Sequence, residues 1–101
     1  MPKGYWIARV DVHDPESYKK YVEANAVAFA KYGAKFLVRS GRFEAPEGHA
    51  RSRNVVIEFK DFETARTCYH SPEYAGAKKL RESASEADVL IIEGYDGPQP
   101  Q

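Results

Sequence analysis

The sequence lacks most of the features that assign a chain of 101 residues to a specialised class. It has a single cysteine, Cys68, so no disulfide can form within the chain, which fits a reducing compartment. Positive and negative charges balance, with 15 Lys and Arg against 15 Asp and Glu. Nucleic-acid-binding modules normally carry a basic excess that neutralises phosphates, so this balance argues against a nucleic-acid partner.

Long apolar runs are also missing. No stretch approaches the ~20 residues that span a bilayer, and the N-terminus lacks the charged and then apolar layout of a signal peptide. We therefore predict a cytoplasmic protein that does not enter membranes. Hydrophobic residues make up 43% of the chain and charged residues 30%, which is typical of a globular domain. We assign this domain to residues 1–96 and predict a disordered tail over residues 97–101.

Alternation of apolar and polar residues predicts four strands, over residues 5–12, 35–40, 53–59 and 88–95. In the second of these, the alternation places Phe36 and Val38 on one face and Leu37 and Arg39 on the other. Residues 41–52 have no strong period and include Gly and Pro. This segment is predicted to be a long, exposed hairpin connection.

Helices are predicted between these strands from their start signals. Asp14-Pro15-Glu16 begins the first helix, because Asp caps free backbone N–H groups and Pro suits the first helical position. Asp61 begins the second helical region, which restarts at Ser71-Pro72-Glu73 and runs to about Ala84. Residues at three- and four-residue spacing predict the buried stripes. They are Tyr18, Tyr21, Val22, Asn25, Phe29 and Tyr32 in the first region, and Ala65, Tyr69, Tyr74, Ala77 and Leu80 in the second.

This order predicts an α+β fold of the ferredoxin-like βαββαβ type, a four-stranded antiparallel sheet with helices on one face. The other face should be polar in a monomer. Here the third and fourth strands are apolar on both faces, as in Val55 and Val56 or Leu90 and Ile91. We therefore predict a homodimer whose sheet faces pack around a twofold axis. The alternative is that the long loop or the tail covers this face.

Five segments resemble the uncharacterised bacterial family DUF-thirteen-thirty, a domain of unknown function. They are residues 3–10, 36–39, 54–59, 69–74 and 92–97, and the resemblance covers nearly the whole chain. Its most specific part is Tyr69-His70-Ser71-Pro72-Glu73-Tyr74, which follows a Val-Ile-Glu-Phe strand. The resemblance implies the dimeric α-β barrel superfamily. It implies no reaction, because relatives range from cofactor-independent monooxygenases and lactone isomerases to haem enzymes and stress-response proteins.

Two polar residues are candidates for a site. Asn25 lies on the apolar stripe of the first helix, where a buried amide needs a partner from the chain, from water or from a ligand. A purely structural amide is the alternative. Arg39 ends the second strand, and its guanidinium can clamp a carboxylate or an enolate. The alternative for Arg39 is an ion pair with Glu58 or Glu44, or a solvated charge at the strand end.

Aromatic residues and histidines give the remaining candidates. Tyr21 and Tyr69 are expected to form pocket walls, with plain core packing as the alternative. His70 is the candidate general base, because the ordinary pKa of histidine suits that role. No two of His13, His49 and His70 have metal-ligand spacing. We therefore predict no metal and no cofactor, and haem bound through a histidine is a lesser alternative.

Together these features predict a cofactor-independent enzyme that acts on a small carbonyl-containing or aromatic metabolite between the helices and the sheet. Asn25 and Arg39 would hold an anionic or carbonyl oxygen of that metabolite. Two alternatives stay open. One is a non-catalytic small-ligand-binding or stress-response protein, and the other is a structural dimer without a pocket. A cavity lined by Asn25, Arg39 and Tyr21 would favour the enzyme or the ligand-binding protein over the structural dimer.

Overall fold

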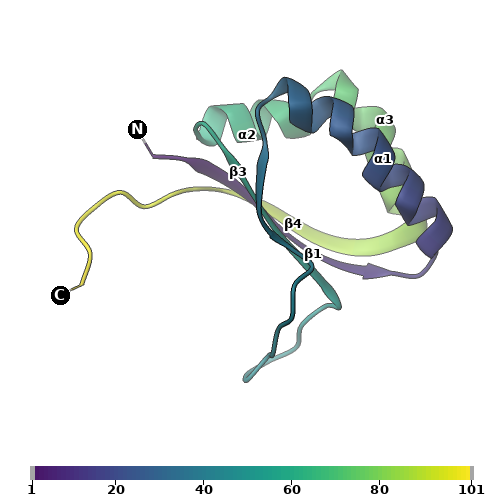
Figure 1. Ribbon diagram of the computed structural model, residues 1–101, viewed down its shortest axis with the longest axis horizontal. Coiled ribbons are helices and arrows are strands. Elements are labelled where there is room, and N and C mark those ends of the chain that lie inside the picture. Colours follow the sequence, from purple (N-terminus) through teal and green to yellow (C-terminus); the bar gives the residue numbers. More distant parts are fainter. Residues whose placement is uncertain (1, 101) are drawn as a thin grey trace.

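The computed structural model describes residues 2–100, so Met1 of the predicted domain and Gln101 of the predicted tail lie outside the described residues. The strands are β1 (Gly4–Val12), β2 (Lys35–Arg39), β3 (Arg53–Phe59) and β4 (Ser85–Glu93). They form one antiparallel sheet in the order β2-β3-β1-β4. The helices all cover one face of it (Figure 1). This is the predicted ferredoxin-like architecture. The helices are α1 (Pro15–Lys31), between β1 and β2, and α2 (Phe62–Tyr69) and α3 (Pro72–Ala84), between β3 and β4.

The helices begin at the predicted capping residues. The Asp61 carboxylate accepts a hydrogen bond from the backbone N–H of Thr64 at 2.7 Å. The Ser71 hydroxyl accepts one from the backbone N–H of Tyr74 at 3.2 Å and donates one to the carbonyl of Cys68 at 2.7 Å. Ser71 therefore ends α2 and begins α3 at the same point. The Asp14 side chain caps α1 in the predicted way.

β4 starts earlier than predicted and also ends earlier. It begins at Ser85, directly after α3, and ends at Glu93, whereas the alternation predicted residues 88–95. The cause is strand pairing, because β1 continues to Val12 and Val12 lies opposite Ser85. Residues 85–87 have only one small apolar side chain among them, so their alternation gives no signal of this pairing.

β2 contains a bulge that changes which side chains share a face. Phe36 lies opposite a buried residue of β3, Val38 opposite a residue of the uncovered face, and Arg39 opposite the buried Val55, with a register shift after Phe36. Leu37 is the extra residue of this bulge. The prediction that Phe36 and Val38 share a face was wrong. Phe36 and Arg39 both lie on the helix-covered face, because the bulge offsets the ordinary alternation.

The core lies between the sheet and the helices and is centred on Trp6. The indole N–H of Trp6 donates to the carbonyl of Ala65 at 2.8 Å, which ties β1 to α2. Gly4 allows the start of α2 to approach β1, because a Cβ at this position would overlap the carbonyl oxygen of Asp61. Within residues 2–100 no helix combines the length and the apolar character that crossing a membrane requires.

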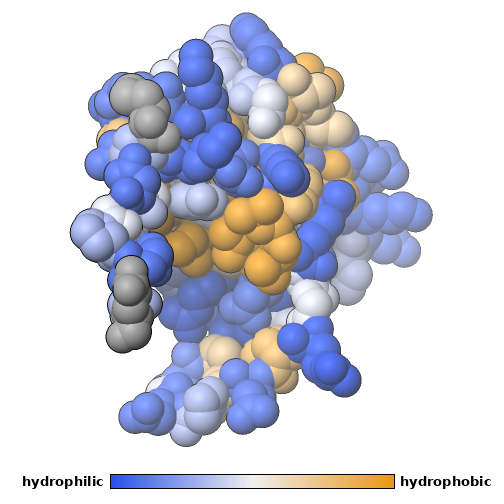
Figure 2. Space-filling view, turned by 60° about the vertical axis from the view of Figure 1, so that its left-hand side comes forward, coloured by the Kyte–Doolittle hydropathy of each residue, from blue (hydrophilic) through white to orange (hydrophobic). Residues whose placement is uncertain are grey.

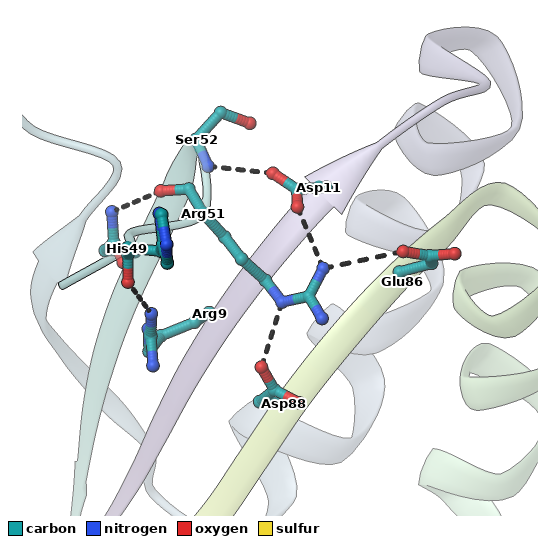
Figure 3. Close-up of polar contacts among 8 residues, drawn as sticks. Arg9, Asp11, His49, Arg51, Ser52, Glu86 and Asp88 are labelled. Carbon is teal, nitrogen blue, oxygen red and sulfur yellow. Dashed lines mark hydrogen bonds and ion pairs between the residues drawn. The ribbon is translucent and has the colours of Figure 1, made fainter.

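The connection between β2 and β3 is irregular and exposed, as predicted. Its last residues are held across the sheet face that the helices leave uncovered (Figure 3). The Arg51 guanidinium lies 2.8 Å from Asp11, 2.9 Å from Asp88 and 3.6 Å from Glu86. The backbone N–H of Ser52 donates to Asp11 at 3.0 Å. These contacts fix the end of the loop over one charged end of the sheet.

The uncovered face carries an apolar row beyond this charged end. The strand register places Val38, Val56, Ile7 and Leu90 side by side across all four strands, and we call these residues the apolar row. Its outer members stay exposed, Val38 at 43% and Leu90 at 49%. The loop between β2 and β3 and residues 94–100 both extend away from the sheet (Figure 1). In one view of the surface, hydrophobic side chains gather in a patch ringed by hydrophilic ones (Figure 2).

Candidate functional site

A narrow cavity lies between α1, α3 and the helix-covered face of the sheet. It brings together Tyr21, Asn25 and Arg39, three of the five predicted site residues. The volume open to a water-sized molecule is about 30 Å³, which is room for one or two waters. An aromatic metabolite therefore enters only if side chains at the mouth move.

Asn25 is placed in the cavity lining by the spacing of α1. Tyr18, Tyr21 and Asn25 recur at intervals of three and four residues, so they share the buried face of the helix. Asn25 is only 6% exposed. Its amide lies close enough to the Tyr21 hydroxyl to act on the pKa of that phenol. A partner from the chain, from water or from a ligand was expected for this amide, and the structure places the Tyr21 phenol beside it.

Arg39 lies at the mouth because of the bulge in β2. A regular strand with Phe36 inward would turn Arg39 to the opposite face. The extra residue, Leu37, returns Arg39 to the helix-covered side, where its guanidinium carbon lies 4.1 Å from the centre of the Phe36 ring. The predicted alternative of an ion pair with a glutamate is not seen among residues 2–100, where Glu58 lies 3.8 Å from Lys3 instead.

Tyr21 and Tyr74 join α1 to α3 beside the cavity. Their hydroxyl oxygens lie 2.7 Å apart, and both side chains are buried. Burial raises the pKa of Tyr21, and the neighbouring Tyr74 adds to this rise while the amide of Asn25 opposes it. Burial also raises the pKa of Tyr74. Both phenols are therefore neutral hydrogen-bonding groups at physiological pH and do not act as bases.

The sequence interpretation missed two arginines of this site. Arg81 occupies the buried position of α3 that was predicted for Leu80, and it is only 7% exposed. The signal was present, because Arg81 follows Tyr74 by seven residues, or two helical turns, and so falls on the same stripe. Arg53 begins β3 on the helix-covered face, with its guanidinium carbon 5.4 Å from the centre of the Tyr18 ring.

The cavity lining is positively charged although the whole chain is neutral. Among the described residues that line it, the charged side chains are Arg39, Arg53 and Arg81, with no carboxylate. None of the three forms an ion pair within residues 2–100. The Nε atoms of Arg53 and Arg81 are buried without a hydrogen-bond partner. Guanidinium groups keep their charge in proteins, so the cavity holds uncompensated positive charge.

Two predicted residues lie outside this lining. Tyr69 packs against Trp6 and Tyr74, at centroid distances of 5.5 and 5.4 Å, and borders a separate depression that also includes Arg81. His70 ends α2, is exposed, and has its ring 5.3 Å from that of Tyr69. Their proposed roles stay predictions. In residues 2–100 no group of three or more His, Cys, Asp or Glu side chains is placed to hold a metal ion.

Several solved structures share the fold of this chain at low sequence identity. A protein of unknown function from Rhodopseudomonas palustris is 16% identical, with a TM-score of 0.75 over 95% of this chain and 85% of that one. SnoaB, a cofactor-independent oxygenase from Streptomyces nogalater, is 14% identical, with a TM-score of 0.64 over 100% of both chains. A dimeric ferredoxin-like protein of unknown function from Thermobifida fusca is 13% identical, with a TM-score of 0.62 over 91% of both.

At such identities the likeness establishes the fold alone, which is ferredoxin-like. The family follows from the sequence. Residues 3–95 match the model described as Domain of unknown function (DUF1330), and the chain belongs to this family, as its motifs indicated. No curated protein matches the sequence.

Proposed function

We propose that the chain is a cofactor-independent enzyme that binds a small carbonyl-containing or aromatic metabolite between the helices and the sheet. The convergence of Asn25, Arg39 and Tyr21 on one cavity carries this proposal. In SnoaB a fold of this kind belongs to a cofactor-independent oxygenase. That neighbour supports the proposal only as a precedent for the fold, so the chemistry has to come from the residues of this cavity.

The cavity offers positive charge and hydrogen-bond donors but no base. Among the described residues of its lining there is no His, Lys, Asp or Glu. Tyr21 and Tyr74 stay protonated, because burial raises the pKa of both phenols. Fixed donors of this kind stabilise negative charge that develops on an enolate or phenolate oxygen. We therefore propose a substrate that ionises readily. His70 would act as its base only if the substrate reached the outer end of α2.

A non-catalytic ligand-binding or stress-response role is the second candidate. The observation that favours it is the absence of a base from the described lining of the cavity. A protein that holds a ligand without transforming it needs donors and walls, and this cavity has both. A structural dimer without any pocket is less well supported, because the buried Arg81 has no ion pair within residues 2–100 and its Nε has no hydrogen-bond partner, which weakens a purely structural core.

We also propose that the apolar row packs against the same row of a second copy. Val38 and Leu90 leave apolar surface exposed at both edges of the sheet, and two structural neighbours of this fold are dimeric. The row is self-complementary in character, which a twofold interface requires. The charged contacts of Arg51 with Asp11 and Asp88 lie at the end of this face, where they would form the rim of the interface.

The function is tested with a panel of enolisable keto acids and phenols incubated with the protein without added cofactor. Substrate loss is followed by mass spectrometry in air and without oxygen. For a substrate that is turned over, Asn25→Ala and Arg39→Ala should each lower kcat/KM by at least about tenfold. Arg42→Ala, in the exposed loop, serves as the matched control.

The results separate the two candidates. If both cavity variants turned over the substrate as well as the control did, the site assignment would be wrong. If panel members bound at the cavity and none was consumed with or without oxygen, the enzyme proposal would fail in favour of a non-catalytic ligand-binding protein.

A further inference from the structure

We infer that the inner end of the cavity is a binding site for the oxyanion of a small organic acid, held by Arg81 with Tyr74 beside it. The oxyanion is a carboxylate or an ionised enol. Arg53 and Arg39 attract the ligand at the mouth. This inference rests on the proposed function for the location of the site, and it adds the charge of the ligand and the residue that recognises it.

Arg81 is a built part of the cavity and not a surface charge that happens to lie near it. Its side chain is 7% exposed and comes from the buried stripe of α3. Its Nε has no hydrogen-bond partner in the chain. A buried donor of this kind needs an acceptor to offset its loss of hydration. The acceptor must then come from outside the chain, and Arg81 lines the cavity through which it would reach this Nε.

The charge of the lining decides which acceptor fits best. Water can accept a hydrogen bond from the Nε of Arg81, but it supplies no negative charge to offset this buried guanidinium, which is 7% exposed. The lining contributes no carboxylate among its described residues, and none of its arginines has an ion pair in residues 2–100. A carboxylate or enolate supplies both the acceptor atoms and the missing negative charge. Guanidinium binds such planar oxyanions through two parallel hydrogen bonds.

The neighbours of Arg81 extend the donor set. Tyr74 lies close enough to interact with the Arg81 guanidinium, and the Tyr74 hydroxyl also shares a hydrogen bond with Tyr21 at 2.7 Å. Either phenol can turn its proton toward an entering oxyanion, because each hydroxyl can donate or accept within this pair. While the pair stays bonded, one phenol donates to the other, so the inner end combines one cation with one neutral donor that either phenol can supply.

The mouth suits a flat ligand body behind the oxyanion. Arg39 stacks on Phe36 at 4.1 Å, and Arg53 lies 5.4 Å from the centre of the Tyr18 ring. These two pairs present aromatic faces and positive charge on the same side of the sheet. Arg39 is exposed, so its side chain can move aside and widen the narrow cavity when a ligand enters. An aromatic or conjugated acid fits this arrangement better than a compact inorganic ion.

The test compares anions with neutral molecules of the same shape. Acetate and benzoate are titrated into the full chain by isothermal calorimetry and by heteronuclear NMR, beside acetamide and benzamide. We expect at least one acid to bind saturably, with shifts at Arg81, Tyr74 and Asn25, and its amide to bind at least about tenfold more weakly. Equal affinity for acid and amide, or no binding of either acid, would overturn the inference.

Arg81→Met is the decisive variant, because methionine fills similar space without charge. It should weaken binding of the acid by at least about tenfold, whereas Arg42→Met in the exposed loop should not change it. Replacing an unpaired buried charge with an apolar side chain is not expected to lower Tm. The bound acid should raise Tm of the unmodified chain and leave that of Arg81→Met unchanged. Undiminished binding by a folded Arg81→Met protein would refute the site.

These outcomes are separable from those of the proposed function. Arg81-dependent binding of the acid without turnover of any substrate would support the anion site and count against the enzyme. Turnover of an uncharged substrate at an unchanged rate in Arg81→Met would keep the enzyme and overturn the anion site.

Discussion

The hydroxyl groups of Tyr21 and Tyr74 meet at 2.7 Å although 53 positions separate them in the chain. This contact fastens α1 to α3 in the interior, directly beside the cavity. The same two tyrosines contact the other polar residues of the site, because the Asn25 amide lies beside the Tyr21 hydroxyl and the Arg81 guanidinium lies beside Tyr74. The same pair therefore stabilises the fold and shapes the candidate site.

The pair should show strong coupling in a double-mutant cycle. Tyr21→Phe or Tyr74→Phe alone leaves one buried hydroxyl without its partner, which costs about 1–3 kcal/mol of unfolding free energy. The double variant has neither hydroxyl, so no hydroxyl is left without its partner. Its loss of unfolding free energy should therefore be clearly smaller than the sum of the losses in the two single variants. Urea unfolding followed by circular dichroism measures all four proteins. Additive losses would show that the two hydroxyls do not stabilise one another.

Local sequence signals predicted the elements well, and the reason lies in the caps. Asp61 and Ser71 determine where α2 and α3 begin through side-chain contacts within three residues, so no distant partner has to be known. The buried stripe that contains Tyr21 and Asn25 likewise follows from helical spacing. The doubly apolar β3 and β4 predicted an uncovered apolar face for the same local reason.

The placement of the arginines was less predictable because it depends on pairing between strands. Arg39 lines the cavity only because Leu37 is accommodated as a bulge, which is visible in the register with β3 and not in the alternation of β2. Arg81 was overlooked because the neighbouring Leu80 is apolar, and hydrophobicity then placed the buried stripe one residue too early. Three-dimensional packing, and not propensity, decides which of the two is buried.

The Asp61 cap should make stability depend on acid. Hydrogen bonds from the hydroxyl and backbone N–H of Thr64 hold the pKa of Asp61 below its ordinary value of 3.8. Because the unfolded chain binds the proton more readily, this stability is complete well above pH 3.8 and is lost as the pH falls through the folded pKa.

Urea unfolding of an Asp61→Asn variant between pH 7 and pH 2 checks the effect. The variant should have a lower midpoint than the unmodified chain at neutral pH and a shallower loss of stability in acid, because it has no carboxylate to protonate. Asp96→Asn, at an exposed position after β4, is the control. It should change neither the unfolding midpoint at neutral pH nor the loss of stability in acid. An unchanged acid slope in Asp61→Asn would exclude the cap as a source of this dependence.

Cys68 should report on opening of the core and not on redox chemistry. It is fully buried at 0% exposure, and burial, with a smaller effect of Glu73, raises the pKa of its thiol to about 12. Only the thiolate reacts rapidly with alkylating agents. Labelling by iodoacetamide at pH 8 should therefore be slow in the native protein and should accelerate as urea approaches the unfolding midpoint. Rapid labelling of the folded chain would contradict this environment.

The last prediction concerns the apolar row and uses two exposed hydrophobic residues as a matched pair. Leu90 lies in the row and is 49% exposed, whereas Val27 lies on the outer side of α1 and is 64% exposed. In a dimer joined through the sheet faces, Leu90→Glu buries a carboxylate from each copy in an apolar interface, which strongly disfavours association. Val27→Glu changes a surface that this interface does not use. Sedimentation velocity at micromolar concentration should therefore show a dimer for the unmodified chain and for Val27→Glu, and a monomer for Leu90→Glu. A stable monomer of the unmodified chain would refute the interface, and so would a dimer that survives Leu90→Glu but dissociates in Val27→Glu.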